Sequence, residues 1–214
     1  MREVKRINPD CRRGGVRIGA SQANSRVTHK NHRYAFDVIV ARDIKNLALV
    51  GFMGVGKSSV GRQLAQDLEF EFVDTDEMIE LETGMKIPEI FAGAGEDAFR
   101  KLEAKLVADS RAWSNKVIAT GGGLAAHGNN LEVLKEGSFV ACLWASPETI
   151  HDRTKHQTHR PLLRADDPLG KIRALLESRE SFYKQADVLV STEQRSVREI
   201  AGNIAHQFRE TQRV

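Results

Sequence analysis

Short apolar runs recur along the chain from residue 46 onward, and stretches with the spacing of amphipathic helices separate them. The runs that predict strands are Leu47–Val50, Phe70–Val73, Val117–Ala119, Phe139–Trp144 and Val188–Val190. Between them, apolar residues repeat every three or four positions, for example Val60, Leu64 and Leu68, and Phe99, Leu102 and Leu106. Strands that alternate with helices predict right-handed βαβ units and a parallel sheet buried on both faces. We therefore expect an α/β domain.

The first part of the chain lacks this pattern and differs in charge. Residues 1–46 hold 11 Lys and Arg against 4 Asp and Glu, a net charge of +7, whereas residues 47–214 have a net charge of −4. We predict a basic, flexible extension over residues 1–45 and one domain over residues 46–214. The extension has three open interpretations, namely a dispensable segment, an organelle transit peptide or a nucleic-acid-binding arm. Residues 34–44 are more apolar and are a candidate for an additional strand.

Composition excludes several classes of protein. No apolar run in the 214 residues approaches the ~18 residues that cross a bilayer. Only Cys11 and Cys142 occur, in no paired pattern, which excludes a disulfide scaffold or zinc module and favours a reducing compartment. We expect a cytoplasmic protein without a membrane partner. The mildly acidic body gives no reason to expect nucleic-acid binding either.

A phosphate-binding loop is the strongest chemical signal. Residues 51–58 (GFMGVGKS) match G-x-x-x-x-G-K-[ST] and lie between a predicted strand and a predicted helix. Loop amides, the helix N-terminus and the Lys57 ammonium attract phosphate, and the Ser58 hydroxyl suits Mg²⁺. The sequence therefore predicts nucleoside triphosphate binding. The expected ATP-binding residues here are Gly54, Val55, Gly56, Lys57, Ser58 and Ser59.

Two carboxylates follow the second predicted strand. Asp74 and Asp76 are two positions apart, so strand alternation would direct both toward the cleft at the carboxyl edge of the sheet. One would assist Mg²⁺ while the other accepts a proton from an acceptor hydroxyl. The alternative to a catalytic role is a structural one, because Thr75 or Asp76 would be a good N-cap for a helix that starts near Glu77. No N-K-x-D segment is present, which disfavours a GTPase and favours a small-molecule kinase.

Five segments in order resemble the shikimate kinase family, from about residue 46 to residue 192. The segments are Gly51–Ser58, Phe72–Asp76, Gly95–Glu103, Thr120–Gly123 and Arg160–Leu163. The resemblance implies a P-loop nucleoside-monophosphate-kinase-like fold, with a five-stranded parallel sheet flanked by helices. It also implies a substrate-binding segment near residues 76–109 and a lid near residues 151–167. The implied reaction converts ATP and shikimate to ADP and 3-phosphoshikimate, a step of aromatic amino-acid biosynthesis, with Mg²⁺ as cofactor. The resemblance also implies a monomer.

The resemblance also implies roles for individual residues. Asp74 would assist Mg²⁺ beside Ser58, and Asp76 would contact the reacting hydroxyl as the base. Arg100 and Arg179 would hold the substrate carboxylate, as planar guanidinium groups do well. For either arginine, the alternative is a solvated position on a helix face. The resemblance also implies that the triple-glycine loop, Gly121, Gly122 and Gly123, contacts substrate hydroxyls.

The resemblance implies roles for two arginines of the lid. Arg160 would reach the transferring phosphate as a catalytic residue together with Lys57, and Arg153 would stack on adenine. The enzymatic alternative is another small-molecule P-loop kinase, such as a gluconate kinase. A catalytically silent nucleotide-binding regulator is the alternative from a different class.

Overall fold

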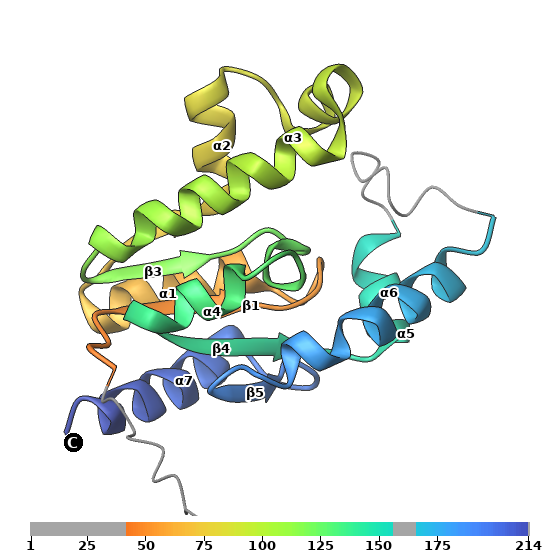
Figure 1. Ribbon diagram of the computed structural model, residues 1–214. Coiled ribbons are helices and arrows are strands. Elements are labelled where there is room, and N and C mark those ends of the chain that lie inside the picture. Colours follow the sequence, from red (N-terminus) through yellow and green to blue (C-terminus); the bar gives the residue numbers. More distant parts are fainter. Residues whose placement is uncertain (1–41, 156–165, 214) are drawn as a thin grey trace, which may run out of the picture. The chain divides into compact units, whose positions relative to one another are not determined.

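A computed structural model describes residues 42–155 and 166–213 of the chain. Strands and helices alternate through both ranges, with two short 3₁₀ turns, η1 and η2 (Figure 1). The elements are β1 (Asn46–Val50), α1 (Lys57–Leu68), β2 (Glu71–Asp74), α2 (Thr75–Thr83), α3 (Ile87–Asp109), η1 (Ser110–Ala112), β3 (Lys116–Ala119), η2 (Leu124–Ala126), α4 (Asn130–Gly137), β4 (Ser138–Trp144), α5 (Pro147–Thr154), α6 (Pro168–Tyr183), β5 (Val188–Ser191) and α7 (Val197–Thr211).

The five strands form one parallel sheet in the order β2-β3-β1-β4-β5. Central strand β1 pairs with β3 on one side, through Leu47 opposite Val117, and with β4 on the other, through Leu47 opposite Phe139. All five residues of β1 are buried, as expected for a parallel strand covered on both faces. The five strands predicted from the apolar runs and the α/β fold are therefore confirmed.

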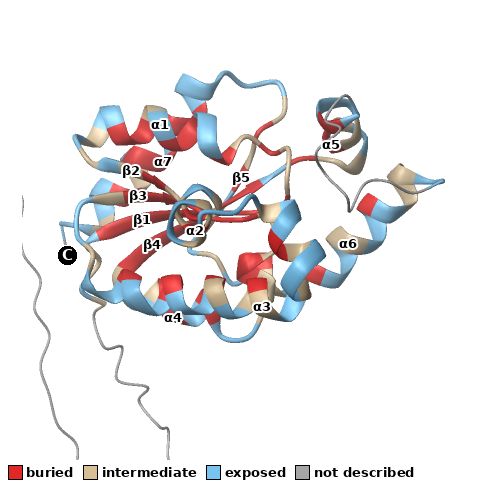
Figure 2. Ribbon diagram, turned by 90° about the horizontal axis from the view of Figure 1, so that it is seen from above, coloured by how far each residue is buried: buried red, intermediate tan, exposed pale blue. Residues whose placement is uncertain are grey.

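Alternating residues of the sheet pack into two separate hydrophobic layers. Leu47 and Leu49 of β1 face α1 and α7, whereas Ala48 and Val50 face the side covered by α3, α4 and α6. Figure 2 shows the buried strands between these two groups of helices. Helices on both faces protect the sheet from water, so the functional groups can gather only where the strands end.

The carboxyl edge of the sheet gathers three loops. β1 ends at the glycine-rich loop before α1, β2 leads directly into α2, and β3 leads into the triple glycine. These three strands are neighbours and run parallel, so their loops emerge side by side at one edge. Helix α3 extends beyond this edge, and it bends at Gly95, whose backbone φ of 81° and ψ of 173° are not helical.

The start of the described chain is attached to the body. Arg42 pairs with Asp187, with Nη2 2.9 Å from Oδ1, and the Lys45 amide donates to the carbonyl of Gly137. Residues 42–45 form neither strand nor helix. The interpretations of residues 1–41, including the transit peptide, the nucleic-acid-binding arm and most of the candidate strand, lie outside the described residues. Within the described ranges, no helix is long and apolar enough to span a membrane.

Candidate active site

The phosphate loop has the backbone that its glycines predict. Gly54 and Gly56 have φ angles of 78° and 97°, in the left-handed region that favours glycine. A Cβ on Gly54 would also lie 2.6 Å from the side chain of Thr154. Buried Lys57 donates from Nζ to the carbonyl oxygens of Gly51 at 2.8 Å and Phe52 at 2.9 Å. The loop thus holds the ammonium close to its own backbone.

Asp74 and Asp76 are positioned in a way that the strand pattern did not predict. The strand ends at Asp74 and Asp76 lies in the first turn of α2, so strand alternation does not apply to Asp76, although both residues line the same cavity. The reason is a cap, because the Asp74 carboxylate accepts the Asp76 amide at 3.1 Å. The other Asp74 oxygen accepts the Ser58 hydroxyl at 2.9 Å. Asp74 therefore caps α2 and contacts the phosphate loop at once.

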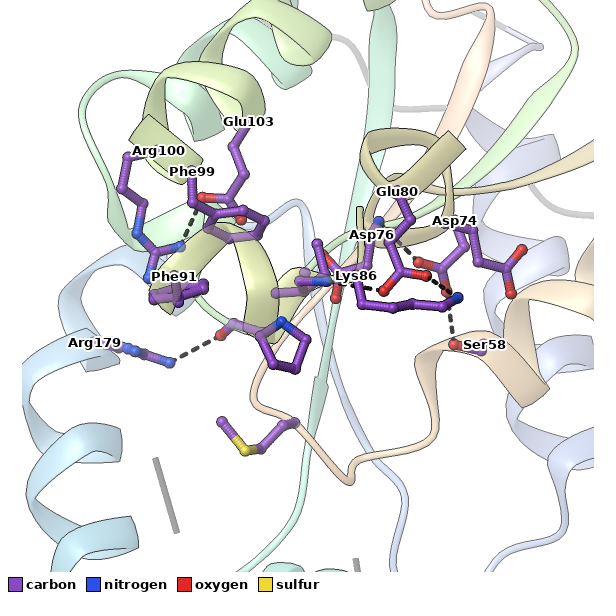
Figure 3. Close-up of a pocket in the computed structure, with 17 residues that line it drawn as sticks. Ser58, Asp74, Asp76, Glu80, Lys86, Phe91, Phe99, Arg100, Glu103 and Arg179 are labelled. Carbon is purple, nitrogen blue, oxygen red and sulfur yellow. Dashed lines mark hydrogen bonds and ion pairs between the residues drawn. The ribbon is translucent and has the colours of Figure 1, made fainter. Parts of the chain in front are cut away.

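A cavity of about 650 Å³ joins the phosphate loop to α3 and α6. This volume is typical of a small-molecule site. In Figure 3, Ser58 and Asp74 lie at one end, and Arg100 and Arg179 at the other. The lining residues are Met53, Ser58, Asp74, Asp76, Glu77, Glu80, Lys86, Ile87, Pro88, Phe91, Phe99, Arg100, Glu103, Gly121, Gly122, Gly123 and Arg179. The cavity therefore has an acidic end beside the phosphate loop and a basic end away from it.

The two arginines are held within the site rather than in solvent. The side chain of Arg100 is 17% exposed and pairs with Glu103 at 2.6 Å and with Glu96 at 2.7 Å. Buried Arg179 donates from Nη1 to the Gly122 carbonyl at 2.9 Å. The alternative of a solvated helix face was therefore wrong for both, because ion pairs and the glycine loop draw them inward.

The triple glycine packs against α2, α3 and α6. The Gly121 amide donates to buried Thr75 Oγ1 at 2.9 Å, and the Gly122 carbonyl also accepts the Tyr183 hydroxyl at 3.3 Å. A Cβ on Gly121 would lie only 2.6 Å from Asp76 Oδ1. Gly121 is thus needed for the close approach of Asp76, and its N–H is used internally. A Cβ on Gly123 would instead meet the guanidinium of Arg100 at 3.2 Å.

Glu103 is a cavity residue to which sequence reasoning assigned no role. Its side chain is fully buried, and Oε1 has no hydrogen-bond partner among the described residues. Burial raises the pKa of its carboxyl to about 7, although the adjacent Arg100 acts in the opposite direction. Thr75 was considered only as a helix cap, whereas its hydroxyl accepts the Gly121 amide. Glu103 lies three residues after Arg100 and so on the same helix face, which was the available signal.

The predicted adenine and lid residues are only partly described. Arg153 on α5 donates to Thr192, from Nη1 to Oγ1 at 3.0 Å and from Nη2 to the carbonyl at 2.9 Å. Nearby Glu193 accepts hydrogen bonds from Ser146 and Thr149, which lower the pKa of Glu193 to about 2. These contacts anchor α5 to the segment after β5. Arg160 and residues 156–165 of the predicted lid lie outside the described residues.

Comparison with known proteins decides the family. The family model for shikimate kinase matches residues 53–209. The chain belongs to the shikimate kinase family. A curated shikimate kinase from Symbiobacterium thermophilum is 45% identical over 168 residues, which cover 77% of this chain and 97% of that protein. One from Thermodesulfovibrio yellowstonii is 42% identical, over 77% of this chain and 95% of its own.

Solved structures agree with this assignment. The shikimate kinase from Acinetobacter baumannii in complex with shikimate has a TM-score of 0.75 and 37% identity, over 79% of this chain and 95% of that one. A gluconokinase from Sinorhizobium meliloti has a TM-score of 0.53 at 18% identity, over 79% and 94% of the two chains, and so shares only the fold. Shikimate kinases are ATP-dependent kinases that phosphorylate shikimate. The gluconate kinase alternative is not favoured, and the P-loop kinase fold is confirmed.

Proposed function

We propose that the cavity divides the phosphorylation of shikimate between its two ends. The acidic end, with Ser58, Asp74 and Asp76, would carry out phosphoryl transfer. The basic end, with Arg100 and Arg179, would hold the shikimate carboxylate. The observation that supports this division is that one cavity is lined by both groups, although they come from α1, β2, α2, α3 and α6.

At the phosphate end, the loop from Gly54 to Ser59 would bind the ATP phosphates through its amides and the Lys57 ammonium. Oxygen atoms of Ser58 and Asp74 lie 2.9 Å apart, and hydroxyl and carboxylate oxygens are the ligands that Mg²⁺ prefers. These residues fit the ion, and we assign them as its protein contacts. When bound, Mg²⁺ supplies positive charge beside the β- and γ-phosphates. Arg160 remains the proposed lid contact to the transferring group.

Asp76 is the proposed base. Its carboxylate would accept the proton of the shikimate 3-hydroxyl while the hydroxyl oxygen forms a bond to the γ-phosphorus. The bond from that phosphorus to the β,γ-bridging oxygen breaks at the same step, and ADP leaves with the bond's electrons. The close packing of Gly121 against Asp76 supports this role, because it restricts where the carboxylate can lie.

The basic end would orient the substrate. Two guanidinium groups, from Arg100 and Arg179, can bind one carboxylate through paired hydrogen bonds. Arg179 is already directed toward the glycine loop by its bond to the Gly122 carbonyl. Gly122 and Gly123 would let the shikimate ring approach the backbone without obstruction, since neither has a side chain. Arg153 remains the proposed adenine contact.

The rest of the molecular description stays predicted. We propose a kinase domain over residues 46–214, with a substrate-binding segment near residues 76–109 and a lid near residues 151–167 whose closure would exclude water. A monomer in the cytoplasm remains the expected state. The extension over residues 1–45 is not required by this proposal.

The function is tested by coupled measurement of ADP release with shikimate, with gluconate and with no acceptor. We expect shikimate-dependent turnover that requires Mg²⁺. Turnover with gluconate but not shikimate would contradict the proposal, as would nucleotide binding without any turnover.

The base is tested by Asp76→Asn, which keeps the size of the side chain but removes its basicity. We expect turnover to fall about 10²–10⁴-fold with the KM for shikimate little changed. A matched control is Glu77→Gln, since Glu77 also lines the cavity but pairs with Arg62 at the surface. Near-normal turnover of the Asp76 variant would remove Asp76 from this role.

A further inference from the structure

Glu103 is the one fully buried acidic side chain among the described cavity residues, and the proposed transfer assigns it no step. One oxygen, Oε2, accepts Nη1 of Arg100 at 2.6 Å. The other, Oε1, has no hydrogen-bond partner in residues 42–155 and 166–213. Burial of a carboxylate with an unsatisfied oxygen disfavours the charged form, whereas the ion pair with Arg100 favours it. The charged and neutral forms of Glu103 are therefore similar in free energy near neutral pH.

The surroundings of Glu103 contain more negative than positive charge. Oε1 of Glu103 and Oδ1 of Asp76 both lie within 3.0 Å of the point where a Cβ on Gly121 would stand. Asp76 and Glu96 both raise the pKa of Glu103, and Arg100 lowers it. Arg100 is therefore the main cation that keeps Glu103 ionised in the absence of substrate.

Other charged groups surround Arg100 rather than Glu103. His127 follows η2, and burial and the adjacent Arg100 lower its pKa. Arg179 approaches from α6, and both it and His127 lower the pKa of Glu96. The Tyr183 hydroxyl beside Gly122 does not ionise near neutral pH, because burial raises its pKa to about 12. Glu103 is thus an acidic group of the cavity whose pKa, about 7, lies close to neutral pH.

A substrate carboxylate at Arg100 would compete with Glu103 for the same guanidinium. The cavity would then hold a new anion beside Glu103, Asp76 and Glu96, and the cation that favours ionised Glu103 would be shared. Like charges in a water-poor site disfavour each other's ionisation. The carboxylate of the bound substrate would stay ionised, because contact with two arginine side chains lowers the pKa of a carboxyl group.

We propose that Glu103 takes up a proton from solvent when shikimate binds, so that the substrate carboxylate replaces the Glu103 carboxylate as the anion held by Arg100. The inference rests on the proposed binding of the shikimate carboxylate by Arg100 and Arg179. Glu103 is a positioning residue in this scheme, because it acts through Arg100. Its neutral form would also remove one negative charge from the vicinity of Asp76 and Gly121.

The pH dependence follows from the direction of the shift. The pKa of Glu103 is about 7 without substrate, and the proposal requires this pKa to rise when shikimate binds. Below about pH 7, Glu103 is already protonated, and binding is at its strongest without proton uptake. Above that, binding requires a proton, and shikimate affinity falls by up to about tenfold per pH unit until the pH reaches the raised pKa.

The test is calorimetric titration of the full chain with shikimate, in buffers that differ in their enthalpy of ionisation. The dependence of the observed heat on that enthalpy gives the number of protons taken up. We expect a large fraction of one proton at about pH 8 and close to none at about pH 6. Zero uptake at both pH values would overturn the proposal.

Variants identify the group. In Glu103→Gln, a neutral mimic of the protonated form, we expect no uptake and shikimate affinity that no longer falls between about pH 7 and pH 8. The matched control is Glu96→Gln, because Glu96 also pairs with Arg100 but its side chain is 54% exposed. It should retain proton uptake. Uptake that persists in Glu103→Gln, or that is lost in His127→Gln instead, would overturn the assignment.

Two further measurements keep the result decisive. If Glu103→Gln does not fold, infrared difference spectra of the unmodified protein at about pH 8 provide the test. The carbonyl band of a protonated carboxylic acid should grow when shikimate is added. Absence of this band would overturn the proposal. Arg100→Ala separates this inference from the proposed function. Unchanged shikimate affinity in that variant would refute the carboxylate site itself, whereas an Arg100-dependent affinity without proton uptake would refute only the role of Glu103.

Discussion

Replacing Gly121 by alanine tests the geometry of the proposed base directly. The added Cβ would lie 2.6 Å from Asp76 Oδ1 and 3.0 Å from Glu103 Oε1, where ordinary contact begins at 3.4 Å. The φ of Gly121 is not in the left-handed region, so alanine introduces no backbone strain of its own. The substitution therefore acts through side-chain displacement, and it acts on the two carboxyl groups.

The size of the effect follows from these distances. Asp76 Oδ1 must move by about 0.8 Å to restore ordinary contact. A misplacement of about 1 Å at a reacting group can lower the rate about 10²-fold, which corresponds to about 2.7 kcal/mol in the activation free energy. Crowding of a packed site also lowers the free energy of unfolding by about 1–3 kcal/mol.

The assay is coupled ADP release at saturating shikimate and ATP, run well below the unfolding temperature of Gly121→Ala. We expect kcat to fall about 10²-fold. The control is Gly123→Ala, whose Cβ would meet the long, movable side chain of Arg100 at 3.2 Å. That variant should raise the KM for shikimate more than it lowers kcat. A kcat of Gly121→Ala close to that of the unmodified protein would refute the argument.

Two further predictions concern parts of the chain away from the cavity. Deleting residues 1–40 should leave kcat and KM unchanged in the coupled assay, because the Arg42–Asp187 ion pair stays intact; loss of folded, active protein would contradict this. Gly202→Ala should raise the free energy of unfolding by about 0.5–1 kcal/mol in urea titration, because Gly202 is exposed within α7 and a Cβ there meets no atom within 4 Å. Unchanged or lower stability of this variant would count against that explanation.

Features governed by neighbouring residues in the chain were predictable from sequence. The five strands were, because each contains a short apolar run, and in central β1 the run Leu47–Val50 is buried throughout. The phosphate loop was predictable too, since the left-handed backbone of Gly54 and Gly56 and the following helix need only local residues. The start of α2 was the limit of this reasoning. Sequence offered strand alternation or a helix cap at Thr75 or Asp76, whereas the cap is Asp74, whose carboxylate accepts the Asp76 amide.

Contacts between distant segments could not be predicted in this way. On sequence alone, Arg100 and Arg179 fitted a solvated helix face as well as a binding site. Arg179 is held by a distant partner, the Gly122 carbonyl 57 residues away, whereas Arg100 forms ion pairs with Glu96 and Glu103 of its own helix. Glu103 is likewise fully buried beside a distant residue, Gly121, which lies 3.0 Å from its Oε1 when measured from the position of a Cβ.

The sequence by itself therefore determined the parallel sheet, the phosphate loop and the resemblance to a kinase family. Tertiary structure alone decided the electrostatics of the cavity, because a pKa depends on burial and on charges brought close in space rather than along the chain. Asp76 and Glu103 are 27 positions apart, yet their carboxyl oxygens flank the same glycine, Gly121. Packing of α2 and α3 against the glycine loop creates that arrangement, and with it the raised pKa of Glu103.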